Sequence, residues 1–136
     1  MIKDILQDSH VIAIVGLSPN PTKDSNIVAN YLKNNGYKII PIYPDKDYIL
    51  DSKVYRSISD ALKENDIDIV VVFRKSKEAL NVAKEIIDNI KYAKNLKALW
   101  FQIGIISDEV EYLTKPYNIY FVQDECIKIQ HKLLFD

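Results

Sequence analysis

Short apolar runs alternate along this chain with longer segments whose apolar residues recur at helical spacing. Uninterrupted apolar runs of this length are typical of strands covered on both faces. The runs lie at 11–16, 37–44, 67–73, 96–103 and 119–122, with a briefer strand expected near Val54–Tyr55. The pattern therefore predicts five or six strands separated by helices.

The helices between these runs carry recognisable end signals. A serine is expected to cap each of four helices at its N-terminus: Ser25, Ser57, Ser76 and Ser107. Asp60 would complete a capping box with Ser57, and Gly36 is expected just past the end of the helix that follows Ser25. That helix should bury one face, formed by Ile27, Val28, Tyr31 and Leu32. A last helix is expected over 125–134.

Strands that alternate with helices predict the α/β class, with right-handed crossovers and a mainly parallel sheet. The expected architecture is a Rossmann-like three-layer α/β/α sandwich. No repeat or linker interrupts the chain, so 1–136 is expected to be one domain. In such folds ligands bind beyond the carboxyl ends of the strands, where the strand order reverses. The segments predicted to meet there are 16–26, Tyr43–Pro44, Phe73–Arg74 and Gln102–Gly104.

The loop after the first strand suits a phosphate, but not in the usual dinucleotide arrangement. Gly16 lets a ligand approach closely, whereas Ser18 and Pro21 stand where G-x-G-x-x-G has its second and third glycines. Free N–H groups at the following helix N-terminus still favour an anion. Polar donors surround it: Ser18, Asn20, Lys23, Ser25 and Asn26. The alternative is an ordinary turn, which uses the same residue types.

The second strand lacks the acid that NAD sites usually carry at its end for the ribose hydroxyls. It ends instead in Tyr43 and Pro44, with Asp45 displaced into the turn. Tyr43 would be an aromatic platform beside a ribose or adenine, or it would simply close the edge of the sheet.

Several pieces of the sequence, in order, resemble the small stand-alone CoA-binding proteins. That family has a Rossmann-like domain similar to the N-terminal domain of the succinyl-CoA synthetase alpha subunit. The pieces are Gly16-x-Ser18, Asn20-Pro21, Lys23-x-Ser25, Gly36-Tyr37, PIYP (41–44), VVVFRKS (70–76), LWFQIGI (99–105) and DECIKIQHKLL (124–134). Two positions depart from the family: Tyr43 replaces a typical Asn, and Asp51 replaces a common glycine.

The resemblance implies a coenzyme A or acyl-CoA ligand and a role for each part of the rim. Gly16, Ser18 and the 20–26 segment, with Pro21 in it, would hold the pyrophosphate. Tyr43–Pro44 and Phe73–Arg74 would flank the adenosine. Arg74, at the end of a strand, would suit the 3′-phosphate of coenzyme A because its planar guanidinium matches a phosphate, or it would be a surface arginine paired with an acid. Gln102–Gly104 would line the path of the pantetheine arm.

The remaining features argue against other functions. A net charge of −1 offers no basic field for nucleic acid, and no run of about 18 apolar residues or signal peptide is present. Cys126 is the single cysteine, which fits a reducing, cytoplasmic setting. Cys126 and His131 would point apart on one helix, and neither a metal set nor a catalytic constellation is found. Cys126 is expected to be a small buried hydrophobe.

The prediction is thus a non-catalytic, cytosolic CoA-binding module, with its physiological role and any enzyme partner left open. Two alternatives remain: an NAD(P)-binding protein of the oxidoreductase type, and an interaction module whose nucleotide site has decayed. Ser18, Pro21 and the missing strand-end acid count against the first, and Tyr43 and Asp51 are the only support for the second.

Overall fold

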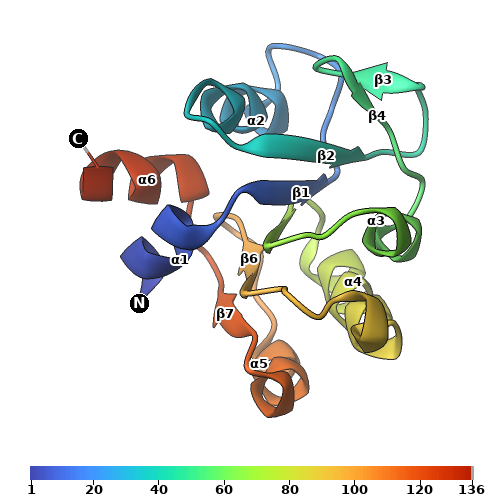
Figure 1. Cartoon of the computed structure of the whole chain (residues 1–136), viewed down its shortest axis with the longest axis vertical. Coiled ribbons are helices and arrows are strands. Elements are labelled where there is room, and N and C mark those ends of the chain that lie inside the picture. Colours follow the sequence, from blue (N-terminus) through green and yellow to red (C-terminus); the bar gives the residue numbers. More distant parts are fainter. Residues whose placement is uncertain (136) are drawn as a thin grey trace.

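A five-stranded parallel sheet forms the centre of the computed structural model, which describes residues 1–135 (Figure 1). The strand order is β2-β1-β5-β6-β7, and each neighbouring pair is parallel. The bounds are β1 Val11–Val15, β2 Lys38–Ile42, β5 Ile69–Val72, β6 Ala98–Phe101 and β7 Tyr120–Val122. Since β1 lies between β2 and β5, the strand order reverses at β1, the strand that leads into the 16–26 loop. The Rossmann-like α/β fold is confirmed.

Helices cover both faces of the sheet (Figure 1). One face carries α1 (Ile2–Asp8), α2 (Asp24–Asn34) and α6 (Ile127–Phe135), and the other carries α3 (Ile58–Glu64), α4 (Ser76–Asp88) and α5 (Asp108–Thr114). Short 3-10 helices follow α4 and α5, at Ile90–Tyr92 and Lys115–Tyr117. None of the helices described in residues 1–135 has the length and apolar character needed to span a membrane.

The alternation of side chains along each strand divides the core into two layers. In β1, Ile12 and Ile14 pack with the layer that includes α2 residues, while Ala13 and Val15 pack with the layer that includes α3 and α4 residues. The strands β5 and β6 alternate in the same way. Both faces of the central strands are therefore buried, which explains their uninterrupted apolar runs.

Only some of the predicted helix caps are confirmed. Ser57 caps α3, because its Oγ accepts a hydrogen bond from the Asp60 N–H at 3.1 Å. Ser25 and Ser76 are wrong as N-caps, since Lys23 and Lys75 precede them as the cap residues of α2 and α4. Both serines lie inside the first turn and accept from distant backbone instead: Ser18 N–H donates to Ser25 Oγ, and Ile106 N–H donates to Ser76 Oγ.

The C-terminus of α2 follows the prediction, but one residue of its face does not. Gly36 has a φ of +94°, and the N–H groups of Gly36 and Tyr37 bond the carbonyls of Lys33 and Leu32. These bonds form a Schellman motif, which requires a residue in this conformation. Ile27, expected on the buried face, is 40% exposed.

A small hairpin replaces the brief third strand that was expected near Val54–Tyr55. It pairs β3 (Tyr48–Ile49) with β4 (Ser52–Lys53), and Tyr55 contributes only a single parallel bridge to Ile42. The turn residues Leu50 and Asp51 both have positive φ. Asp51 therefore occupies a conformation that glycine adopts more easily. It lies at the tip of this hairpin and not at the carboxyl ends of the strands of the main sheet.

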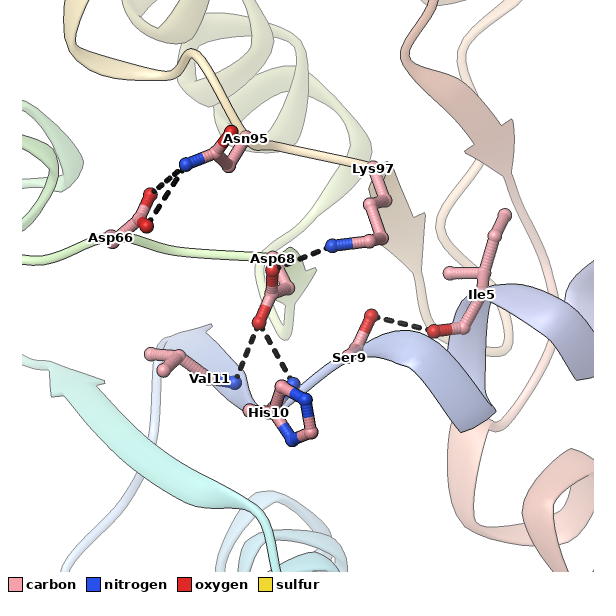
Figure 2. Close-up of polar contacts among 8 residues, drawn as sticks. All are labelled: Ile5, Ser9, His10, Val11, Asp66, Asp68, Asn95 and Lys97. Carbon is pink, nitrogen blue, oxygen red and sulfur yellow. Dashed lines mark hydrogen bonds and ion pairs between the residues drawn. The ribbon is translucent and has the colours of Figure 1, made fainter.

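A charged cluster ties together the amino ends of three strands (Figure 2). The Asp68 carboxylate accepts hydrogen bonds from Lys97 Nζ at 2.8 Å and from the backbone N–H groups of His10 and Val11 at 2.8 and 2.9 Å. Burial disfavours the ionised form, but the hydrogen bonds from Lys97, His10 and Val11 outweigh it, so the pKa of Asp68 lies below its ordinary value. The cluster joins the starts of β1, β5 and β6.

Replacing Asp68 with asparagine should lower the free energy of unfolding by about 2 kcal/mol near neutral pH, because charge-assisted hydrogen bonds are lost. Because the pKa of Asp68 is lower in the folded than in the unfolded protein, its ionised form stabilises the fold at pH values above the unfolded pKa, 3.8. This stabilisation is lost as the pH falls through the folded pKa. The difference between wild type and Asp68→Asn should therefore shrink in urea titrations as the pH is lowered below 3.8.

Asp66→Asn is the matched control. Asp66 is exposed and accepts only from Asn95 Nδ2 (Figure 2), so this change should cost little at either pH. Equal losses for the two variants would contradict the role assigned to Asp68.

Candidate functional site

Gly16 marks the point where the chain leaves β1 and passes directly over the end of β5. Its φ is +85°, and its N–H donates to the Ile42 carbonyl at 2.9 Å. A Cβ at this position would lie 2.5 Å from the Phe73 carbonyl oxygen and 3.3 Å from Arg74 Nε. No side chain fits between the loop and β5, so Gly16 brings the ends of β1, β2 and β5 into contact.

The polar side chains of the following loop mainly hold the loop itself. Asn26 Nδ2 donates to the Ser18 carbonyl at 2.9 Å, Ser18 Oγ accepts from the Asn20 N–H, and Asn20 Oδ1 accepts from Thr22. Ser25 and Asn26 are 6% exposed. These residues were predicted as phosphate donors, but their hydrogen bonds fix the backbone at the start of α2. The groups left for an anion are the first N–H groups of α2 and the exposed Lys23.

The arginines of the chain, Arg56 and Arg74, have different surroundings. Arg56 Nη1 donates to the carbonyls of Tyr43, Asp45 and Lys46, and it closes the turn after β2. Arg74 is half-buried at the end of β5, and its side chain forms no ion pair or hydrogen bond with the rest of residues 1–135. A half-buried guanidinium without an acidic partner, beside Gly16 and the α2 N-terminus, suits an anionic ligand.

A cavity of about 590 Å³ opens beside Arg74, at the carboxyl ends of β5 and β6. The cations on its wall are Arg74, Lys75 and Lys128, and Asp24 is the one acid among them in the described part of the chain. The rest of the wall is mainly apolar and comes from the ends of β5 and β6, from α2 and from the start of α6: Ile27, Val28, Phe73, Gln102, Ile103, Gly104, Ile105, Cys126 and Ile129. Such a cavity can hold an anionic group at one end and a largely apolar chain along its length.

The structure thus brings four of the predicted residues into one cavity: Phe73, Arg74, Gln102 and Gly104. The loop residues Gly16, Ser18, Asn20, Pro21 and Lys23 lie at the same edge of the sheet but outside the cavity wall, as do Ser25 and Asn26 in α2. Tyr43 and Pro44 follow β2, on the opposite side of β1 from the cavity. Tyr43 is half-buried, and its N–H donates to the Tyr55 carbonyl at 3.0 Å.

Cys126 and His131 lie in different surroundings, as the sequence indicated. Cys126, expected to be a small buried hydrophobe, packs against the apolar core but is only half-buried, and it lies on the cavity wall. His131 is buried beside Tyr31, whose hydroxyl lies 2.6 Å from Nδ1, and its ring contacts Tyr37 edge to face. Burial, with a smaller effect of Tyr31, raises the pKa of Tyr37, whose hydroxyl donates to the Leu6 carbonyl. This cluster packs α6 against α1 and α2.

A larger cavity, of about 800 Å³, lies at the amino ends of β6 and β7. Its wall includes Lys97, which is already paired with Asp68, and the residues around the end of α5. Parallel α/β sheets bind their ligands at the carboxyl ends of the strands. The smaller cavity, next to Gly16, is therefore the candidate site.

The family of the chain follows from its similarity to known proteins. Residues 10–132 match the family described as CoA binding domain. The chain belongs to the CoA-binding domain family. The uncharacterized protein YneT of Bacillus subtilis is 35% identical over 130 residues, which cover 96% of this chain and 91% of YneT.

A solved structure and a longer relative extend the comparison. A hypothetical protein from Pyrococcus horikoshii superimposes with a TM-score of 0.87 at 30% identity, covering 99% of this chain and 90% of that one. The ADP-forming acetate–CoA ligase of Methanocaldococcus jannaschii is 28% identical over 123 residues. The match covers 88% of this chain but only 17% of the ligase.

Sequence reasoning missed the part of the CoA-binding domain cavity that comes from helices. Ile27 was assigned to a buried face and Cys126 to the core, and Lys128 and Ile129 were not predicted as site residues. One signal was available: only the short connection 123–126 separates β7 from α6, so the N-terminus of α6 has to lie near the carboxyl edge of the sheet.

Proposed function

We propose that this protein binds coenzyme A or an acyl-CoA at the carboxyl edge of its sheet and does not transform it. The observation that carries the proposal is Arg74, which has no hydrogen-bond or ion-pair partner in residues 1–135 and lies against Gly16 beside the apolar cavity. Coenzyme A has an anionic nucleotide end joined to a long, uncharged pantetheine arm. The ligand and the site therefore share the same division into an anionic end and an extended neutral part.

The pyrophosphate would lie over Gly16, against the first N–H groups of α2, with the guanidinium of Arg74 beside it. Arg74 Nε lies 3.3 Å from where a Gly16 Cβ would be, so the geometry favours the pyrophosphate over the 3′-phosphate as the partner of Arg74. The pantetheine arm would follow the cavity past Phe73 to Gln102 and Gly104. Tyr43 and Pro44, across β1, would border the adenosine.

Family membership and the ligase relative support the same ligand. The segment of the acetate–CoA ligase that resembles this chain belongs to an enzyme named for its use of CoA. Within residues 1–135, no nucleophile in the proposed site is paired with a base. Cys126 and His131 lie apart, and His131 Nδ1 lies 2.6 Å from the Tyr31 hydroxyl. We therefore assign the site a binding role, in the cytosol, as a carrier, sensor or subunit.

Coenzyme A should raise the Tm of the protein by several degrees, and more than NAD or NADP does. At about a hundredfold excess over Kd, a ligand that binds only the folded state adds about 2.7 kcal/mol of stability. Thermal denaturation with each nucleotide measures the difference. A larger shift with NAD would overturn the proposal, and mass spectrometry of ligand released from purified, denatured protein gives an independent check.

A further inference from the structure

Cys126 places a thiol on the wall of the candidate cavity. It immediately precedes α6, and its carbonyl accepts from the Gln130 N–H at 3.0 Å. That bond fixes Cys126 at the N-terminal end of the helix, with its half-buried side chain contributing to the cavity wall. The Cys126 side chain also packs against the apolar core, so the thiol is held in place on the wall of the cavity.

Gln102 supplies an independent sign of a ligand at the same place. The residue is only 4% exposed, and its Oε1 accepts from the Ile127 N–H at 2.9 Å. Its Nε2 has no acceptor in the described chain. Within residues 1–135, every fully buried side-chain nitrogen or oxygen has a hydrogen-bond partner. Because Gln102 Nε2 has none, this atom is in contact with solvent, and Gln102 lies on the cavity wall.

An unpaired amide donor on a side chain this well buried favours a ligand that brings an acceptor. Gln102 and Cys126 are also linked in position, because the residue that donates to Gln102 is Ile127, next to Cys126. Both residues also line the same cavity, so a ligand that fills it contacts both. The pantetheine arm of coenzyme A has amide carbonyls along its length and a thiol at its end.

We propose that Cys126 is a site of reversible disulfide formation with coenzyme A; this rests on the CoA-binding function proposed above. The thiolate of Cys126 attacks one sulfur of CoA disulfide. A bond forms between Cys126 Sγ and that sulfur, while the original S–S bond breaks. The second coenzyme A leaves as its thiolate and takes up a proton from water. The exchange conserves the number of disulfides, and excess thiol reverses it.

The test is intact-mass spectrometry of the reduced protein after incubation with CoA disulfide. We expect a mass increase of one CoA moiety that dithiothreitol removes and that Cys126→Ser abolishes. Bound ligand raises the effective concentration of the reacting sulfur, so the rate should saturate and exceed that with pantethine by about tenfold or more. Pantethine is the matched probe, since it has the same reacting arm but no nucleotide.

A second variant tests the part played by Gln102. Gln102→Glu keeps an acceptor for the Ile127 N–H and removes the amide donor, so it should slow the reaction with CoA disulfide while the protein remains folded. Equal rates for Gln102→Glu and the wild type would show that the Gln102 amide does not contact the reacting ligand, and would overturn its placement in this cavity.

Calorimetry on Cys126→Ser with reduced coenzyme A separates failure of the disulfide from failure of the binding function. Binding without adduct formation in the wild type would overturn the disulfide proposal alone. Equal rates with CoA disulfide and pantethine would also overturn it, because they would show an accessible thiol without guidance by the nucleotide. Absence of binding to Cys126→Ser and to the wild type would overturn the CoA-binding function itself.

Discussion

Gly16→Ala should abolish detectable CoA binding and lower the free energy of unfolding by about 2–5 kcal/mol. An alanine held in the left-handed region costs roughly 1–2 kcal/mol. The new Cβ would also stand 2.5 Å from the Phe73 carbonyl oxygen, which forces the loop away from β5 at a further cost of about 1–3 kcal/mol. Urea titration measures the stability, and calorimetry with coenzyme A measures the binding.

Gly36→Ala separates backbone strain from contact with the site. Gly36 has a similar φ of +94°, but a Cβ there would meet no atom within 4 Å, and the residue lies at the far end of α2. The control should therefore lose only the roughly 1–2 kcal/mol of conformational strain and keep its affinity for coenzyme A. Wild-type affinity in a folded Gly16→Ala protein would remove this loop from the binding site.

The sheet and the edge that carries the site could be predicted because both depend on patterns that are local in sequence. The run Ile69–Val72 is apolar at every position, and such a strand has to be covered on both faces. Once the strands are parallel and joined by helices, their carboxyl ends share an edge, which places Gly16, Arg74 and Gln102 together.

The remaining features depend on contacts between distant residues, and the sequence does not contain them locally. Ser76 resembles an N-cap, but its hydroxyl accepts from Ile106, thirty residues away, and the helix begins one residue earlier. The hairpin turn at Leu50–Asp51 has positive φ at both positions without glycine or asparagine, so it lacks the usual turn signal. The Lys33 Nζ bond to the Leu50 carbonyl holds that turn against α2.

The rotation of each helix about its axis was the other unpredictable quantity, and it decides what lines the cavity. An apolar residue at helical spacing can face either the core or a ligand, and the composition is the same in both cases. Ile27 is exposed at the cavity while Val28, its neighbour, is 4% exposed. A sequence pattern can place such a residue on a helix, but the packing of α2 against α6 determines which side it presents.

Arg74→Ala should weaken the binding of coenzyme A by about 1.5–3 kcal/mol, or roughly 10- to 150-fold in Kd, because hydrogen bonds to a charged group are lost. The guanidinium has no competing partner in residues 1–135, so its removal should not destabilise the fold. Arg74→Lys should recover only part of the affinity, since a point charge replaces a planar fork. Lys84→Ala, which removes an exposed charge from α4, is the control and should bind as the wild type does.

Dephospho-coenzyme A identifies the phosphate that Arg74 contacts. The position of Arg74 Nε over Gly16 predicts that Arg74→Ala loses the same free energy of binding with coenzyme A and with the dephospho form, because both keep the pyrophosphate. A loss confined to coenzyme A would instead assign Arg74 to the 3′-phosphate, as the sequence suggested. The loss should shrink as salt rises, since Arg74 is only half-buried and its charge is screened. Unchanged binding of both ligands would leave Arg74 as a surface residue, and the anionic end of the ligand would then depend on the first turn of α2 and Lys23.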